Sequence, residues 1–379
     1  MTKQELLTDI IRAYKDARLH KRNMCYQLEF EYNLEANLHK LCDELWARTY
    51  KPRPSTCFII HDPKMREVFA ADFRDRIVHH LFYNYTYKTY ERTFIADSYS
   101  CIKDRGTHYG IGRLRHHILS ESHGYQRECY VLKIDIKGYF MHINRKKLWQ
   151  LCNRRIHPDS FEVYLLDVIL NLDPLDGCII LGNRNDWNSL PDDKSLFKAA
   201  PDCGLPIGNL SSQLFSNVYL NEFDQYCKRV LKARHYGRYV DDAYFVSHDR
   251  AWLKSIIPQI RQFLLSELGL ELNERKLQIT NVQHGVEFLG AFVKPYRTYP
   301  STSSWKRMKK KVRIAVADKH LSGKELQAKV NSHLGVMSHY DCYDMRRVFF
   351  GYESGLTERG WFDKGILRFY PSEKTDILS

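Results

Sequence analysis

The sequence predicts an α+β fold, and three observations support this prediction. Apolar residues recur at helical spacing near the N-terminus, short central stretches alternate apolar and polar residues like strands, and the last part reads as helical and basic. The 379-residue chain is 44% hydrophobic and 13% aromatic, which is typical of a globular protein. A chain of this length can form one large core or two to three subdomains.

The first 50 residues are predicted to be helical. Thr2 and Glu5 form a possible capping box at the start. One helix face carries the apolar residues that follow: Leu6, Leu7, Ile10, Ile11 and Tyr14. Prolines then end the helical region, and residues 58–60 and 67–69 are predicted as short strands around a turn at residues 62–63. The next segment, residues 72–94, is predicted as a helix from the spacing of its apolar residues: Phe73, Ile77, Leu81 and Tyr85.

The central part begins with a predicted strand. Residues 129–140, "CYVLKIDIKGYF", alternate apolar and polar residues and reach Asp135. Residues 145–200 are interpreted as a helical stretch and a polar loop. A Gly/Pro-rich turn then leads into a long helix, which Asn209 or Ser211 could cap. Its predicted inner face consists of Leu214, Val218, Tyr226 and Val230.

Two adjacent aspartates interrupt a strand-forming stretch at residues 235–247, "HYGRYVDDAYFVS". Aspartate disfavours strands, so Asp241 and Asp242 are predicted to form the tip of a strand–turn–strand unit. A helix is expected near residues 251–268, then a turn, "LGLELNERK", and a strand, "GVEFLGAFV". From about residue 300 the pattern is helical and basic, which predicts a separate helical module.

The overall charge indicates a polyanionic partner. The net charge is +13, with 58 basic and 45 acidic residues, and lysines and arginines that neutralise phosphates release counterions. A soluble basic enzyme acting on small molecules is the alternative. The ten cysteines are scattered, without zinc-binding spacing, so they are expected to be reduced thiols. Without a signal-peptide pattern or an apolar run of about 18 residues, the protein is expected to be soluble and cytoplasmic, with no membrane partner.

The aspartates predict a metal site. If the strands that carry Asp135 and the pair Asp241 and Asp242 are neighbours in one sheet, three carboxylates converge at one edge. Their repulsion is relieved by Mg²⁺, which prefers hard oxygen ligands and also holds substrate phosphates. Two such ions could activate a hydroxyl and stabilise a leaving pyrophosphate. The alternative is an ordinary hairpin turn with solvated aspartates.

Several motifs occur in an order that resembles reverse transcriptases. "VLKIDIKGYF" resembles the first palm motif, "GLPIGNLSSQ" the second, "YVDD" the third, "LGLELNERK" the fourth, and "GVEFLGAFV" the primer-grip motif. Upstream, "PKMREVFAADFRDRIVHH" and "ERTFIADSYSCIKDRGTHYGIGRL" resemble fingers motifs. The similarity covers roughly residues 50–300. Within this superfamily, Ile207 and Gly208 followed by "NLSSQ" resemble the enzymes of diversity-generating retroelements, in place of the Gln-Gly of intron and retroviral enzymes.

The resemblance implies a role for each matching residue. Asp135 and Asp241 would bind metal together with the Ile136 carbonyl, and Asp242 would support the site. Phe140 matches an aromatic gate that excludes a ribose 2′-hydroxyl, and Lys276 a proton donor to pyrophosphate. Contact with the incoming nucleotide is implied for Lys64, Arg66, Gly138, Tyr139, Phe140, Ile207 and Gly208. The primer grip would be Phe288, Leu289 and Gly290. The template–primer backbone would be held by Trp305, Lys306, Lys309 and Lys310.

The resemblance also predicts architecture and activity. A right-hand polymerase is expected, with an N-terminal extension and fingers over residues 1–125, a palm with an antiparallel sheet over 126–298, including an insert at about 145–200, and a helical thumb over 299–379. It would be an RNA-directed DNA polymerase that copies a retroelement template RNA into cDNA, with errors at template adenines, using two Mg²⁺ ions and dNTPs.

The expected partners are a structured template RNA, the RNA–cDNA duplex and a small, basic, pentameric helical accessory protein. Two alternatives stay open at this point. One is another bacterial reverse transcriptase of the intron, retron or phage-defence type. The other is a non-catalytic RNA-binding protein on the same scaffold.

Overall fold

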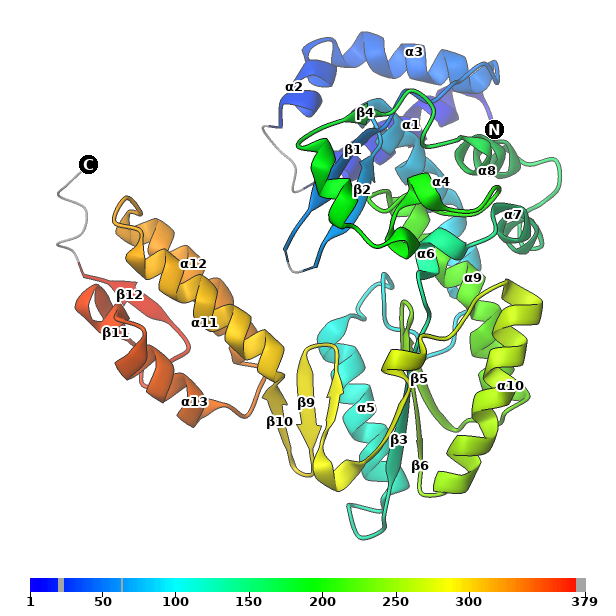
Figure 1. Cartoon of the computed structure of the whole chain (residues 1–379). Helices are drawn as coiled ribbons and strands as arrows, with labels where there is room; N and C mark the ends of the chain where they lie inside the picture. Colours follow the sequence, from blue (N-terminus) through cyan, green and yellow to red (C-terminus); the bar gives the residue numbers. More distant parts are fainter. Residues whose placement is uncertain (20–23, 63, 373–379) are drawn as a thin grey trace. The chain divides into compact units, whose positions relative to one another are not determined.

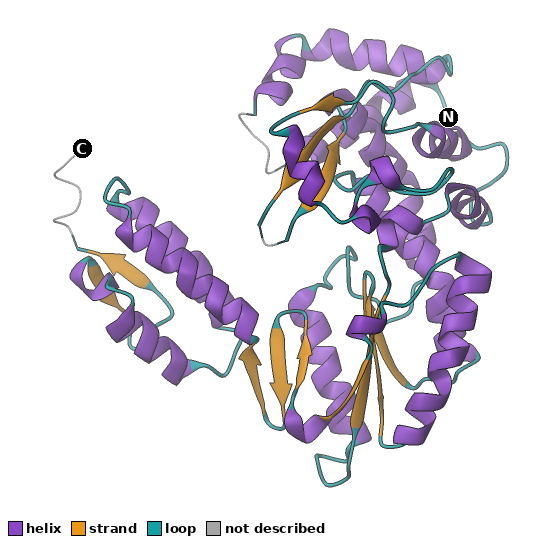
Figure 2. Cartoon of the chain, in the orientation of Figure 1, coloured by secondary structure: helices purple, strands orange, loops and turns teal. Residues whose placement is uncertain are grey.

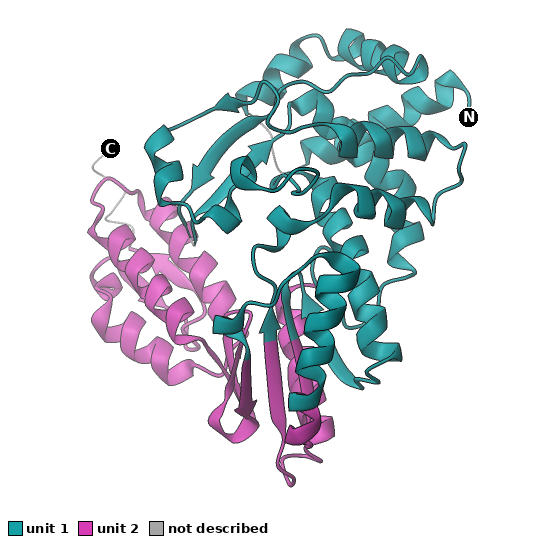
Figure 3. Ribbon diagram, turned by 45° about the vertical axis from the view of Figure 1, so that its right-hand side comes forward, with its two compact units in different colours: residues 1–104, 134–243, 254–277 teal, residues 105–133, 244–253, 278–379 magenta. Residues whose placement is uncertain are grey.

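The computed structural model describes residues 1–19, 24–62 and 64–372 of the chain. Helices and short sheets follow one another, which confirms the predicted α+β class (Figures 1 and 2). The chain divides into two units (Figure 3). Unit 1 comprises residues 1–104, 134–243 and 254–277, and unit 2 comprises residues 105–133, 244–253 and 278–379. The three-domain boundaries stay a prediction.

Unit 1 begins with three helices: α1 (Lys3–Arg18), α2 (Cys25–Tyr32) and α3 (Leu34–Trp46). The predicted capping box is present, because the Thr2 hydroxyl accepts from the Glu5 amide and the Glu5 carboxylate accepts from the Thr2 amide. The apolar face of α1 buries Leu6, Ile10 and Tyr14. This helix packs along α4 (Phe73–Glu91), which confirms the helix predicted within residues 72–94.

A three-stranded sheet in unit 1 has the order β2-β1-β4. The two predicted strands are confirmed as β1 (Thr56–Ile60) and β2 (Arg66–Ala70), which pair antiparallel with Thr56 opposite Ala70. The turn predicted at residues 62–63 includes Pro63, which lies outside the described residues. The third strand, β4 (Ile179–Ile180), pairs parallel with β1 and comes from the segment interpreted as a loop.

Unit 1 also contains α6 (Tyr139–His142), α7 (Arg145–Asn153), α8 (Phe161–Asn171) and α9 (Leu210–Arg229). Asn209 is the N-cap residue of α9, as predicted, but its side-chain oxygen accepts from the Ala71 amide at 3.2 Å instead of capping the helix. Leu214 and Val218 are buried as predicted. The prediction for Val230 is wrong: this side chain is 62% exposed, because the helix has ended at Arg229.

A four-stranded sheet has the order β5-β6-β3-β7. Its strands are β3 (Tyr130–Asp135), β5 (His235–Tyr239), β6 (Asp242–Ser247) and β7 (Gln278–Asn281), and helix α10 (Arg250–Leu268) follows β6. Strand β3 pairs antiparallel with β7. The predicted strand–turn–strand unit is present, but the turn is formed by Val240 and Asp241, and Asp242 already belongs to β6.

Unit 2 contains α5 (Thr107–Glu121) and a sheet of β8 (Val286–Phe288), β9 (Ala291–Lys294) and β10 (Arg297–Pro300). The segment "GVEFLGAFV", predicted as one strand, is a hairpin. Leu289 and Gly290 both have positive φ, 50° and 81°, which is the requirement of a tight two-residue hairpin turn.

The chain continues into α11 (Thr302–Ala317), α12 (Gly323–Met337) and α13 (Tyr343–Val348), as the helical pattern predicts. Their core includes Leu326, Val330, Leu334, Phe349 and Phe350. A short hairpin of β11 (Gly360–Phe362) and β12 (Phe369–Pro371), which was not predicted, packs on α12.

Candidate active site

Three carboxylates meet at one end of the four-stranded sheet. Asp135 is the last residue of β3, Asp242 is the first residue of the neighbouring strand β6, and Asp241 lies in the turn just before it. Burial, together with the charges of Asp242 and Asp135, raises the pKa of Asp241 to about 7. Carboxylates influence one another in this way only at short range. The structure therefore brings together the three aspartates that the sequence singled out.

Lys276, for which the resemblance implied the role of a proton donor, lies against this cluster. Its ammonium donates to Asp135 Oδ2 at 2.5 Å. Burial works against the ammonium, but its hydrogen bond to Asp135 and the charges of Asp242 and Asp241 leave the pKa of Lys276 raised. The positive charge of the Lys276 ammonium therefore offsets part of the negative charge of the three aspartates.

Asn273 completes the surroundings of Asp135, and sequence reasoning missed it. Its amide nitrogen donates to the Asp135 carbonyl at 2.8 Å, and its side chain donates to Asp135 Oδ1 at 3.1 Å. The Lys137 amide donates to the Glu271 carbonyl at 2.9 Å, so residues 271–273 run beside the end of β3. In the sequence, the only feature that could have indicated Asn273 is its position inside the fourth motif, "LGLELNERK".

A divalent cation suits the donors of this cluster. Three carboxylates supply hard oxygen ligands and an excess of negative charge, which Mg²⁺ prefers. Within the described residues, no three His, Cys, Asp or Glu side chains are already arranged as a metal-binding group. The Lys276 ammonium contacts one oxygen of Asp135 instead. The residues present fit the metal by charge and donor type, and metal binding stays a prediction.

The turn that carries Asp241 has a strained backbone and is stabilised by a hydrogen bond from Arg238. Val240 has φ of 54°, a left-handed conformation that a β-branched residue rarely adopts. Its carbonyl accepts from Arg238 Nη1 at 2.9 Å. Arg238 is 1% exposed and donates through Nε and Nη2 to Asp224, at 2.8 and 2.6 Å. Burial works against the guanidinium, but Asp224 raises the pKa of Arg238.

This buried ion pair was also missed. Arg238 and Asp224 are 14 residues apart, and nothing in their neighbourhoods marks them as partners. Tyr236 donates to the same carboxylate at 2.7 Å. The Arg238 carbonyl accepts from the Tyr99 amide at 2.9 Å, which links strand β5 to the upstream segment that resembles a fingers motif. The network supports the turn that carries Asp241 through the hydrogen bond from Arg238 to the Val240 carbonyl.

Three of the residues predicted to contact the incoming nucleotide, Gly138, Tyr139 and Phe140, lie shortly after Asp135 in the chain. Gly138 has φ of 53°, and Tyr139 is buried with its hydroxyl donating to the Ser216 carbonyl at 2.6 Å. Phe140 is half-buried and packs edge-on against Tyr139, with ring centroids 5.4 Å apart. The Phe140 carbonyl accepts from the Leu205 amide at 2.8 Å.

The second palm motif lies on strand β2. The Ile207 carbonyl accepts from the Phe69 amide at 2.8 Å, and a Cβ at Gly208 would lie 2.7 Å from the Phe69 carbonyl oxygen. With φ of 133° as well, position 208 requires glycine. Arg66 begins the same strand, and both Arg66 and Lys64 are exposed. Strand β2 therefore connects the predicted phosphate-contacting residues with the predicted base-contacting residues.

The predicted primer-grip residues form the β8–β9 hairpin of unit 2. Phe288 is buried and packs edge-on against Tyr244, with centroids 5.1 Å apart. Leu289 and Gly290 are the turn. The Gly290 carbonyl accepts from the Ser301 amide at 2.8 Å, which links the hairpin to the start of α11.

The four residues predicted to hold the template–primer backbone line one shallow hollow on α11: Trp305, Lys306, Lys309 and Lys310. Two of these side chains also interact with neighbouring residues of unit 2. Trp305 packs edge-on against Phe349 at 6.0 Å, and Lys309 pairs with Glu353 at 2.6 Å. The more exposed cations of this set are therefore Lys306 and Lys310.

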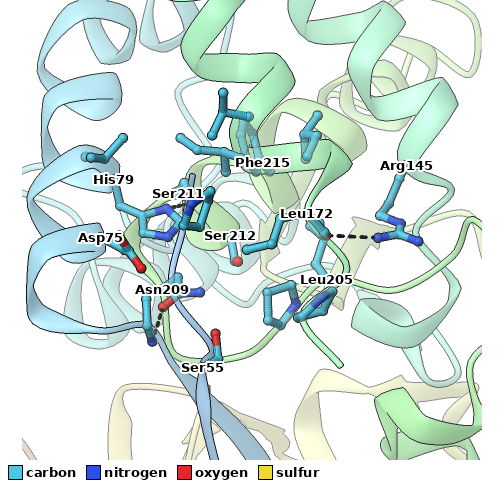
Figure 4. A pocket seen from close by; sticks show the side chains of 18 of the residues that line it. Ser55, Asp75, His79, Arg145, Leu172, Leu205, Asn209, Ser211, Ser212 and Phe215 are labelled. Carbon is cyan, nitrogen blue, oxygen red and sulfur yellow. Dashed lines mark hydrogen bonds between the residues drawn. The ribbon is translucent and has the colours of Figure 1, made fainter. Parts of the chain in front are cut away.

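A second cavity lies in unit 1 beside the start of α9 (Figure 4). Its lining includes Asn209 and Ser211 of the second palm motif and Arg145 and Leu172 of the insert. His79 of α4 contacts Ser211, with its Nδ1 2.6 Å from the serine hydroxyl (Figure 4). Burial, together with the charges of His80 and Arg76, lowers the pKa of His79 to about 4.

We expect His79 to make stability depend on pH. Its pKa in the folded chain is below the ordinary value of 6.5, so the unfolded chain binds more protons between pH 6.5 and 4. Stability should be complete above pH 6.5 and fall by about 1–3 kcal/mol as the pH drops toward 4. Denaturant unfolding at several pH values measures this slope. The variant His79→Gln should lose this part of the slope, whereas His157→Gln, at an exposed position, should keep it. An unchanged slope in His79→Gln contradicts the prediction.

Comparison with known proteins decides the family. Residues 61–293, more than half of the chain, match the family model described as reverse transcriptase (RNA-dependent DNA polymerase). This chain belongs to the reverse transcriptase family. The match contains Asp135, Asp241, Asp242 and Lys276 and confirms the predicted resemblance at this level. It also confirms the enzyme class, an RNA-directed DNA polymerase.

Individual relatives are distant. The chain is 28% identical over 294 residues to Protein YkfC of Escherichia coli (strain K12), covering 68% of this chain and 71% of that protein. Among solved structures, apo telomerase from Candida Tropicalis, truncated from the C-terminal domain, is similar with a TM-score of 0.47 and 12% identity, over 65% of this chain and 55% of that one. Telomerase from Candida albicans, in complex with a TWJ fragment of telomeric RNA, is similar with a TM-score of 0.44 and 12% identity, over 86% and 62%. The chain thus spans less than two thirds of either telomerase.

Across residues 1–19, 24–62 and 64–372, no helix has the length and apolar character needed to cross a membrane. The individual roles of the site residues remain predictions.

Proposed function

We propose that this reverse transcriptase copies a retroelement template RNA into cDNA, with errors at template adenines that diversify a variable protein gene. The observation that carries the polymerase part is the aspartate cluster of Asp135, Asp241 and Asp242, with Lys276 against it, inside the stretch that matches the family. The retroelement type is supported by Ile207 and the sequence "GNLSSQ" after it.

The three aspartates and the Ile136 carbonyl would hold two Mg²⁺ ions. Bound metal would stabilise the charge that develops on the attacking and leaving oxygens of nucleotidyl transfer. The chain itself contributes the fixed positions of the carboxylates: Asn273 orients Asp135, and Arg238 supports the Val240–Asp241 turn. Lys276 carries a proton on Nζ at 2.5 Å from Asp135, where it can pass that proton to the leaving pyrophosphate.

Nucleotide binding is assigned to residues around the start of strand β2 and to the turns that carry Gly138 and Gly208. Arg66 and Lys64 would neutralise the triphosphate, and Gly138 and Tyr139 would place Phe140 beneath the sugar. Phe140 would exclude a 2′-hydroxyl by steric contact. Ile207 and Gly208 would lie against the incoming base pair.

Duplex binding is assigned to unit 2. Phe288, Leu289 and Gly290 would hold the primer end. Trp305 and the lysines around it would contact the backbone of the RNA–cDNA duplex. The resemblance further supports a structured template RNA, dNTPs and a small basic pentameric helical accessory protein.

Primer extension tests the proposal. The purified chain should extend a DNA primer on an RNA template with dNTPs and Mg²⁺, and chelation of the metal should stop it. Sequencing of the products should show substitutions concentrated opposite adenines. Failure to extend any primer would overturn the polymerase, whereas extension with evenly distributed errors would overturn only the retroelement type.

The residue at position 207 should set the error spectrum. A branched aliphatic side chain offers no hydrogen bond to the nascent pair, so geometric checking is weak. Ile207→Gln should lower the substitution frequency opposite adenines by about tenfold, the effect of roughly one hydrogen bond. The matched control is Ile207→Leu, which adds no hydrogen-bonding group and should keep the spectrum. An identical spectrum in Ile207→Gln removes this residue from the explanation.

A further inference from the structure

Glu67 is a buried carboxylate that the proposed reaction does not use. It lies on β2, next to Arg66, and is 1% exposed. Three donors from the insert point at it: Trp187 Nε1 at 2.7 Å, the Ser195 hydroxyl at 2.8 Å and the Leu196 amide at 2.5 Å. A buried charge is costly unless hydrogen bonds replace its hydration. All three of these bonds come from one segment, residues 183–199, which we call the strap.

The strap packs on the predicted nucleotide pocket. Leu196 shares a small core with Cys57, Phe69 and Met141, and both Phe140 and Ile207 pack against that core. Phe197 of the strap lies 5.9 Å from the ring of Phe69, between ring centroids. The predicted sugar gate and the predicted base-contacting residue therefore rest on the same cluster, and the strap supplies part of it.

The strap backbone also limits the turn that carries Phe140. A Cβ at Gly138 would lie 2.7 Å from the carbonyl oxygen of Asp193. Gly138 and Phe140 are two residues apart in a turn that begins with a left-handed residue. A shift of the strap would change the space around this turn.

Strand β2 transmits the same constraint to Ile207. Glu67 and Phe69 are two residues apart, so their side chains lie on the same face of the strand. The Phe69 amide holds the Ile207 carbonyl at 2.8 Å, while its ring packs with Leu196 of the strap. The carboxylate of Glu67 thus joins the strap to the strand on which the Ile207 turn lies.

We propose that Glu67 is a positioning residue for nucleotide selection, because it anchors the strap and the strap holds Phe140 and Ile207 in place. This inference rests on the proposed polymerase function. A steric gate discriminates only when its ring cannot retreat, and well-packed surroundings supply that resistance. Loosening the strap lets the ring move away from a 2′-hydroxyl, so the preference for deoxynucleotides decreases.

The experiment compares dNTP and rNTP incorporation by single-turnover primer extension. Glu67→Gln keeps the volume but turns one acceptor oxygen into a donor. Trp187→Phe with Ser195→Ala removes two donors from the opposite side and leaves Glu67 intact. In both variants the ratio of dNTP to rNTP efficiency should fall by about three- to tenfold, because roughly tenfold is the effect of one lost hydrogen bond to a charged group. Phe140→Ala removes the gate ring itself and should give the largest decrease in the ratio of dNTP to rNTP efficiency.

Hydrogen exchange of residues 183–199 measures the anchoring itself and should become faster in both variants. The matched control is Asp186→Asn, which removes an exposed contact of the same strap to His61 at 3.3 Å and should change neither measurement. The ratio is informative because a general loss of structure would lower both efficiencies together. If the double variant does not fold, Trp187→Phe and Ser195→Ala are measured singly.

Two results would overturn the proposal: faster exchange of the strap with an unchanged ratio, or exchange that stays slow after the donors are removed. If the unaltered chain extends no primer, the polymerase function fails instead, and hydrogen exchange still reports whether Glu67 anchors the strap.

Discussion

The variant Asp241→Asn should lose RNA-templated DNA synthesis by at least about a thousandfold, because a metal-binding charge contributes several kcal/mol to the transition state and each 1.4 kcal/mol is tenfold in rate. Asparagine has the same size, so the turn formed with Val240 can keep its shape. The loss therefore tests the charge at this position, separately from the packing around it.

Folding and RNA binding should survive the same change. Burial and the charges of Asp242 and Asp135 already disfavour the ionised form of Asp241, which the raised pKa of about 7 expresses. Removing one of three repelling charges should leave the unfolding midpoint the same or higher. RNA affinity should stay within about twofold, because phosphate contacts come mainly from lysine and arginine.

Asp176→Asn is the matched control, since Asp176 is an exposed carboxylate of the insert. Single-turnover primer extension, RNA binding and thermal unfolding are measured on both variants. Retained synthesis in Asp241→Asn, with its usual metal dependence, would exclude this aspartate from the catalytic site.

Replacement of Arg238 by methionine should have the largest effect on stability. The Arg238 and Asp224 side chains are 1% and 0% exposed, and their closest atoms are 2.6 Å apart. Removing one partner leaves a buried charge uncompensated, which costs about 3–5 kcal/mol. The same change removes the hydrogen bond to the Val240 carbonyl, so the strained turn loses its support. Denaturant unfolding measures the stability, and primer extension the activity.

Two further variants separate these effects. Arg261→Met breaks an exposed pair with Glu274, at 2.9 Å, and should cost less than about 1 kcal/mol. The double variant Arg238→Met with Asp224→Leu removes both charges and should regain part of the stability, since buried ion pairs can often be replaced by apolar residues. It should not regain activity, because the Val240 carbonyl still lacks its donor. Full activity in the double variant would show that Arg238 does not position the turn.

The aspartate cluster could be predicted because its signals are local. Asp135 ends an alternating stretch, and Asp241 and Asp242 interrupt another, so the residue types conflict visibly with their surroundings. The order of the motifs added the family, which the match over residues 61–293 confirms. The capping box of α1 and the strands β1 and β2 followed from equally local patterns.

Predictions were wrong where one residue's conformation decided the outcome. Leu289 adopts a left-handed conformation, and this turns an apparent strand into the β8–β9 hairpin. Val240 does the same, which moves the turn so that Asp242 belongs to β6. Neither leucine nor valine favours this conformation, so composition could not indicate the turn.

The sequence by itself determined the α+β class, the reverse transcriptase family and the aspartates of the candidate site, because alternation, helical spacing and motif order are properties of neighbouring residues. Only the tertiary structure decided that Lys276 contacts Asp135, that Arg238 pairs with Asp224 and that Glu67 holds the strap. These contacts join residues 141, 14 and up to 129 positions apart. A polar side chain on a strand carries no mark of whether it will be buried, because its partners arrive only when distant segments pack together.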